Sequence, residues 1–162
     1  DLPRIMISQT GTTVKNDPMD MVFLLKGVPL FTGLSGEQLL PVADIAHRVT
    51  FEKGDIVFEQ GHPGLHVYLI LDGEVEVIHD GDRVATLGEK QCFGEMALLD
   101  QGERSASIRC TDDVELLAIS RDDFQDLLDL YPALAKGIIR TLTQRLRVAN
   151  DAQRQEQEAR RL

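Results

Sequence analysis

The feature that most constrains this chain is a change of hydrophobic period between residues 47 and 120. In that stretch, short β-branched runs recur between glycines, and apolar and polar residues alternate most clearly from Leu65 to Leu71. Many short strands at this spacing are typical of an antiparallel sandwich or jelly roll. The predicted strands are Val49–Phe51, Ile56–Glu59, Val67–Leu71, Val75–Ile78, Val84–Leu87, Ala106–Arg109 and Val114–Ile119.

Helical spacing frames this region on both sides. Ahead of it, residues 18–46 predict two helices, the second begun by a capping box of Ser35 and Gln38. Behind it, Ser120 is the expected cap of a helix that breaks at Pro132, and a longer helix follows with an apolar stripe to about residue 149. The polar residues 150–162 predict a solvated helical extension.

The predicted fold class is therefore α+β and mainly β. It is an antiparallel β jelly-roll barrel with two N-terminal helices and two C-terminal helices, and a further short helix is expected in a loop of the barrel. We expect one domain over residues 18–149, made of helices at 18–46, a jelly roll at 47–120 and helices at 121–149. Residues 1–17 are expected to be a flexible lead-in or linker, and the start at Asp1 suggests a piece of a longer polypeptide.

The charge and the cysteine content limit the functions and cellular locations that this chain can have. Seventeen Lys and Arg against 27 Asp and Glu give a formal net charge of -10, which weighs against direct nucleic-acid binding. No apolar run approaches the roughly 20 residues that span a bilayer, so no membrane insertion of this segment is expected. Two cysteines, Cys92 and Cys110, are typical of a reducing compartment. We expect a cytoplasmic location, with the cytoplasmic part of a membrane protein left open.

One segment between two predicted strands carries the chemistry. It begins at Cys92, and Gly94 frees the backbone to turn. The next residues, Glu95–Leu99, predict a helical turn with outward N-terminal amides, after which Gly102 lets the chain swing back to Arg104. Amides at a helix start, one guanidinium and a neighbouring hydroxyl suit a single phosphate group. A phosphate would repel Glu95, so that carboxylate is expected to meet a different group, such as a sugar hydroxyl.

This segment resembles the phosphate-binding cassette of the cyclic-nucleotide-binding domain family, a double-stranded β-helix jelly roll. The family pattern runs F-G-E-x-A-L, then a short loop, then R-[ST]-A, and here it begins at Phe93 and resumes at Arg104. The resemblance extends from about Phe23 to Leu146.

The resemblance implies a role for each matching position. Arg104 would pair with the cyclic phosphate, and Glu95 would accept from the ribose 2′-hydroxyl. Backbone groups and small side chains would complete the ligand contacts at Gly94, Met96, Ala97, Ser105 and Ala106.

The last long helix offers a lid for the base. No Trp occurs in the chain and no aromatic residue follows Tyr131, so ring stacking from this helix is excluded. A lid would consist of aliphatic and Arg side chains, and we expect Leu142, Arg145 and Leu146 to form it, with Arg147 nearby.

The predicted function is a regulatory module that binds a 3′,5′-cyclic nucleotide, with cAMP favoured over cGMP. It would signal by moving its C-terminal helix against the effector domain of the parent polypeptide, a channel, transporter, kinase or sensor. No enzyme activity, metal or cofactor is expected, because no nucleophile with an adjacent base and no ligand cluster occurs. A transcription activator would need a helix-turn-helix after the long helix. A homodimer is left open, and the alternative function is a structural or interaction module of the same fold that does not bind nucleotide.

Overall fold

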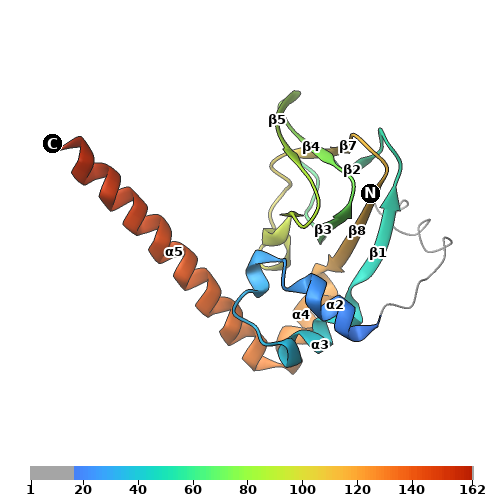
Figure 1. The fold of residues 1–162 in the computed structure, drawn as a ribbon, viewed down its shortest axis with the longest axis horizontal. Coiled ribbons are helices and arrows are strands. Elements are labelled where there is room, and N and C mark those ends of the chain that lie inside the picture. Colours follow the sequence, from blue (N-terminus) through green and yellow to red (C-terminus); the bar gives the residue numbers. More distant parts are fainter. Residues whose placement is uncertain (1–16, 162) are drawn as a thin grey trace.

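Two four-stranded antiparallel sheets form the centre of the molecule (Figure 1). The computed structural model describes residues 17–161, so all but the last residue of the lead-in expected at residues 1–17 lies outside the described part. One sheet has the order β1 (His47–Phe51), β8 (Val114–Ser120), β3 (His66–Asp72) and β6 (Cys92–Phe93). The other has the order β2 (Ile56–Phe58), β7 (Ser107–Cys110), β4 (Val75–His79) and β5 (Asp82–Leu87). This arrangement confirms the predicted jelly-roll fold.

Alternation along the central strand β3 divides the apolar residues into two cores. Tyr68 and Ile70 point between the two sheets, where they join residues of β1, β2 and β7. Val67 and Leu69 point to the opposite face of their sheet and pack under the helices. Because successive side chains of a strand face opposite sides, one buried strand serves both cores.

Three of the four α-helices within residues 17–161 begin after a residue whose side chain caps them. At α2 (Pro18–Leu25), Asp17 accepts from the Met19 amide, and at α4 (Arg121–Leu130), Ser120 accepts from the Asp123 amide. The predicted capping box is present at α3 (Gly36–Ile45). Each cap satisfies amides that have no partner inside the helix.

The count of helices differs from the prediction. Four α-helices occur within residues 17–161, the last being α5 (Pro132–Arg160). The short helix of the loop is instead the 3₁₀ segment η3 (Glu95–Leu98), and a second 3₁₀ segment, η2 (Pro29–Phe31), follows α2. The i to i+3 bonds of 3₁₀ structure suit such short segments better than α-helical bonds do. Strand β6 was not predicted, because two residues are too few to show a period.

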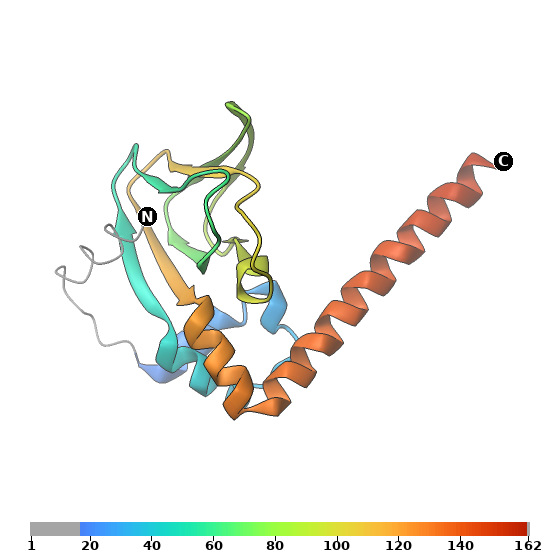
Figure 2. The ribbon, with the colours of Figure 1, turned by 180° about the vertical axis from the view of Figure 1, so that it is seen from behind.

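Helix α5 is packed at its start and free at its end. Leu134 and Ile138 are buried in the helix-side core, whereas every described residue from 143 onward is exposed. Figures 1 and 2 show the helix leaving the body of the domain and continuing into solvent. None of the helices within residues 17–161 combines the length and apolarity that crossing a bilayer would require.

Phe124 holds α4 in the helix-side core. Its side chain is fully buried, and its ring centroid lies 5.7 Å from that of Phe31 in η2. We expect Phe124→Ala to lower the free energy of unfolding by about 3–5 kcal/mol, because it leaves a cavity. Phe23→Ala, at a ring that is 76% exposed, should change it by less than about 0.5 kcal/mol. Urea denaturation measures both, and equal losses would contradict this assignment of the core.

Candidate functional site

The predicted cassette lies between β6 and β7, and contacts with the helices hold it in place. Gly94 precedes η3 with φ of 76°, a left-handed conformation that favours glycine. Leu98 is fully buried in the helix-side core, and its carbonyl accepts a 2.6 Å hydrogen bond from Nε2 of Gln125 in α4. The cassette and the C-terminal helices therefore share both a core and a polar contact.

Arg104 is the central charge of the site. Its backbone amide donates to the His62 carbonyl at 2.7 Å, and its carbonyl accepts from the Gly61 amide at 2.8 Å. These bonds direct the side chain inward, where the residue is only 9% exposed. No Asp or Glu within residues 17–161 is ion-paired with its guanidinium.

The guanidinium of Arg104 is held by uncharged groups. Its Nη2 donates to the His66 carbonyl at 2.6 Å, and its Cζ lies 3.9 Å from the centre of the Phe58 ring. The buried Nε has no hydrogen-bond partner, and burial lowers the pKa of the group from its ordinary value. A buried donor without a partner is costly, so this arginine is prepared to bind an anion.

Gly94 makes room for that arginine. A Cβ atom at Gly94 would overlap Nη1 of Arg104, whereas a Cβ at Gly64 would lie at an ordinary contact distance of 3.4 Å from Cζ of Arg104. The backbone at Gly94 thus approaches the guanidinium as closely as the absence of a side chain permits. Such close approach is a reason for glycine that turn formation alone does not provide.

A pocket of about 330 Å³ opens beside Arg104. Its volume is at the lower end of the range usual for small-molecule sites. The lining includes all but one of the residues predicted to contact ligand, namely Gly94, Met96, Ala97, Arg104, Ser105 and Ala106. Residues that sequence reasoning did not assign to the site also line it: Phe58, Gly64, Val77, Phe93, Asp100, Gly102, Glu103 and Ile108.

Glu95, the remaining predicted residue, does not line this pocket. Its Oε1 accepts a 2.9 Å hydrogen bond from Nη2 of Arg145 in α5, which makes an ion pair between the cassette and the last helix. Its Oε2 is buried and has no partner. One oxygen is therefore held by α5 while the other is free to accept from a hydroxyl.

The residues predicted to form the lid have other positions in this structure. Leu142 packs against the helix-side core, Arg145 holds Glu95, and Leu146 is 62% exposed. None of the three is among the residues that line the pocket. A lid built from them would require α5 to move, and it stays a prediction.

Burial favours the uncharged forms of two side chains beside the site, His66 and Cys92. Burial, and then the nearby Arg104, lowers the pKa of His66. Burial and the neighbouring Glu95 raise the pKa of the Cys92 thiol to about 12, so it remains protonated at neutral pH. The positive charge that an anionic ligand would meet here is that of Arg104.

Comparison with known proteins identifies the family and its fold. Residues 48–131, from β1 to the end of α4, match the family profile described as the cyclic nucleotide-binding domain. The chain belongs to this family. The match contains Arg104, Glu95 and every residue that lines the pocket.

Relatives of this cyclic nucleotide-binding domain come from proteins with different effectors. The chain is 39% identical over 131 residues to the Cyclic AMP receptor protein of Thermus thermophilus, covering 78% of this chain and 61% of that protein. It is 34% identical over 106 residues to a cAMP-dependent protein kinase regulatory subunit of Emericella nidulans, covering 64% of this chain and 26% of that one. The chain thus spans less than two thirds of either relative.

A solved structure with the same fold belongs to a different kind of protein again. The N-terminal domain of a transcriptional regulator from Streptomyces coelicolor A3(2) is 34% identical, with a TM-score of 0.74 over 80% of this chain and 96% of that one. The expected restriction of effectors to channels, transporters, kinases and sensors was therefore too narrow. The predicted exclusion of nucleic-acid binding is likewise not supported for the parent protein.

Gly94→Ala tests how closely the cassette is built around Arg104. The new Cβ would collide with the guanidinium and would also strain a left-handed backbone. Gly81→Ala is the matched control, because Gly81 has φ of 85° and open space around its Cβ. We expect the control to reduce stability by about 1–2 kcal/mol, and Gly94→Ala to reduce it by roughly 1–3 kcal/mol more. Thermal and urea denaturation measure both, and equal effects would show that no close approach exists.

Proposed function

We propose that this domain is a regulatory binding module for a 3′,5′-cyclic nucleotide, with cAMP favoured over cGMP, and that it is not an enzyme. The observation that carries the proposal is Arg104, a buried guanidinium that faces a pocket without a carboxylate partner. A single negative phosphodiester would give it the missing partner. Two relatives named for cAMP support the choice of nucleotide.

Glu95 is suited to bind the ribose of the same ligand. Its Oε2 is a buried acceptor without a donor, and the ribose 2′-hydroxyl is a donor of suitable size. A cyclic nucleotide presents a phosphodiester and this hydroxyl close together on one rigid ring system. Glu95 begins η3 and Arg104 follows at the end of the same cassette. The proposal thus uses the two groups within residues 17–161 whose buried side-chain atoms have no hydrogen-bond partner.

Signalling through α5 is the second part of the proposal. The cassette contacts the helices at two polar points, Gln125 with the Leu98 carbonyl and Arg145 with Glu95. A ligand bound to the free oxygen of Glu95 would change the energy of the pair that Arg145 makes with the other oxygen. Differential affinity of this kind is what moves a two-state equilibrium.

The partner would be an effector domain in the same polypeptide, in the cytoplasm. The relatives include a receptor protein, a kinase regulatory subunit and part of a transcriptional regulator, so the proposal extends to DNA-binding effectors. A homodimer stays a prediction. The competing function is a structural module that does not bind nucleotide. It is disfavoured because it would leave the buried Nε of Arg104 without a hydrogen-bond partner.

Titration calorimetry with cAMP, cGMP and linear AMP tests the ligand class. We expect cAMP to bind most tightly and AMP not to bind measurably, because the open ring and extra charge of AMP do not match one arginine. Arg104→Ala should weaken cAMP binding by roughly 30-fold to several thousand-fold. Arg83→Ala, at an exposed arginine of β5, is the control and should bind as the native domain does. Native affinity in Arg104→Ala, or binding of AMP alone, would reject the proposal.

A double-mutant cycle tests the coupling to α5. We expect Arg145→Ala to weaken cAMP binding by about 3- to 10-fold, since Glu95 loses the group that orients it. In a Glu95→Gln background the same change should have less than about a twofold effect, because the ion pair is already lost. Arg154→Ala, on an exposed part of the helix far from the predicted lid, is the control. Additive losses across the cycle would contradict transmission through this pair.

A further inference from the structure

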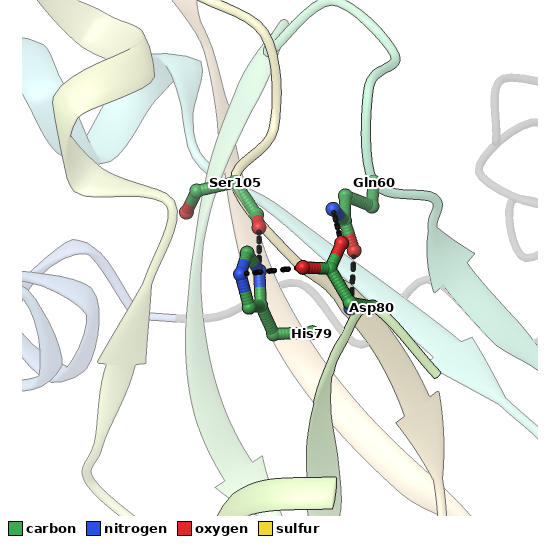
Figure 3. A network of polar contacts seen from close by, with 4 residues as sticks. All are labelled: Gln60, His79, Asp80 and Ser105. Carbon is green, nitrogen blue, oxygen red and sulfur yellow. Dashed lines mark hydrogen bonds and ion pairs between the residues drawn. The ribbon is translucent and has the colours of Figure 1, made fainter. Parts of the chain in front are cut away.

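A polar network joins the exit of the cassette to the turn between β4 and β5 (Figure 3). Nδ1 of His79, the last residue of β4, lies 2.8 Å from the Ser105 carbonyl oxygen. Its other ring nitrogen, Nε2, lies 3.2 Å from Oδ2 of Asp80. Asp80 and Gln60 exchange two hydrogen bonds, of 2.8 and 2.9 Å. Three separate loops therefore meet at the residue that follows Arg104.

The protons in this network are fixed by the chemistry of its partners. A carbonyl oxygen only accepts, so Nδ1 of His79 is the donor to Ser105. The Asp80 carboxylate also accepts, and it faces Nε2. Gln60 fixes that carboxylate through its own amide group. The contact with Ser105 therefore requires a proton on Nδ1, and the contact with Asp80 is a hydrogen bond only when Nε2 carries a second proton.

The hairpin turn explains why the network forms at this place. Asp80 has φ of 51° and Gly81 has φ of 85°, and His79 pairs with Asp82 across the turn. Two central residues with positive φ, in the sequence Asp-Gly, are typical of the type I′ turn of a two-residue hairpin. This turn places Asp80 beside the imidazole of His79. The positions of His79 and Asp80 in the network are therefore set by a regular hairpin turn.

Ser105 connects this polar network to the pocket. Ser105 lines the pocket next to Arg104, its residue is exposed, and its carbonyl accepts a hydrogen bond from the imidazole of His79. Figure 3 shows its carbonyl directed to His79 while its hydroxyl points away from the imidazole. Holding the carbonyl fixes the backbone of Ser105 and with it the position of Cβ, from which the hydroxyl reaches out in one of its staggered rotamers.

We propose that His79 is a positioning residue for the pocket, which orients Ser105 for the phosphate end of the ligand through the Nδ1 to carbonyl hydrogen bond. The inference rests on the proposed function, because it takes a cyclic nucleotide as the ligand. His79 itself does not line the pocket. It acts on affinity through the peptide of Ser105 and not by touching the ligand.

Calorimetric titration of the whole chain with cAMP separates this role from a merely structural one. His79→Leu and His79→Gln remove a donor at the position of Nδ1, and each should weaken binding by roughly 3- to 10-fold, as for one lost hydrogen bond. His79→Asn keeps an amide donor at the same distance along the side chain and should bind within about twofold of the native chain. His47→Leu, at an exposed histidine of β1 in the other sheet, should leave binding unchanged.

The same substitution in a Ser105→Ala chain gives the decisive comparison. If His79 acts by orienting the Ser105 hydroxyl, His79→Leu should then weaken binding by less than about twofold. A loss of equal size with and without that hydroxyl would overturn the proposal, and so would native affinity in both His79→Leu and His79→Gln. Absence of cAMP binding by the native chain would reject the proposed function and this inference with it, and that result is visible before any variant is made.

Discussion

The burial of one guanidinium is the interaction on which the site depends. Removing Arg104 from water is expensive unless its donors are satisfied, and the fold supplies only a carbonyl at His66 and the ring of Phe58. The glycine at 94 lets the backbone approach that group more closely than a side chain would allow. The conformation of the cassette and the burial of its arginine therefore depend on each other.

Much of this architecture could be predicted from local patterns, because the patterns have local causes. Alternation from Leu65 to Leu71 predicted β3, and the Ser35–Gln38 pair predicted the start of α3. Most of the pocket lining could be predicted because it is contiguous in sequence. The position of Phe58 could not, because it depends on the pairing of β2 with β7, a long-range contact that leaves no local signal. The ion pair between Glu95 and Arg145 escaped prediction for the same reason.

The division of β3 and β8 between two cores explains how a pocket can be linked to helices on the other side of a sheet. Along β8, Leu116 and Ala118 belong to the core between the sheets, and Leu117 and Ile119 belong to the core under the helices. Neither core can be repacked without affecting the strands that they share. Leu98 of the cassette is part of the helix-side core, so a displacement of Leu98 would change its contacts with α4.

The length of α5 has a mechanical consequence. A helix rises about 1.5 Å per residue, so the 15 residues from Arg145 to Arg160 extend roughly 22 Å beyond the ion pair with Glu95. A rotation of only about 10° near Gly137, where the helix backbone meets Leu34, would carry the far end through roughly 6 Å, since that arm is about 35 Å long. If α5 signals as proposed, it would act as a lever with an arm of about 12 Å from Gly137 to Arg145 and an arm of about 35 Å from Gly137 to Arg160. A shift of about 2 Å at the ion pair would then become about 6 Å at the far end, where a neighbouring domain could detect it.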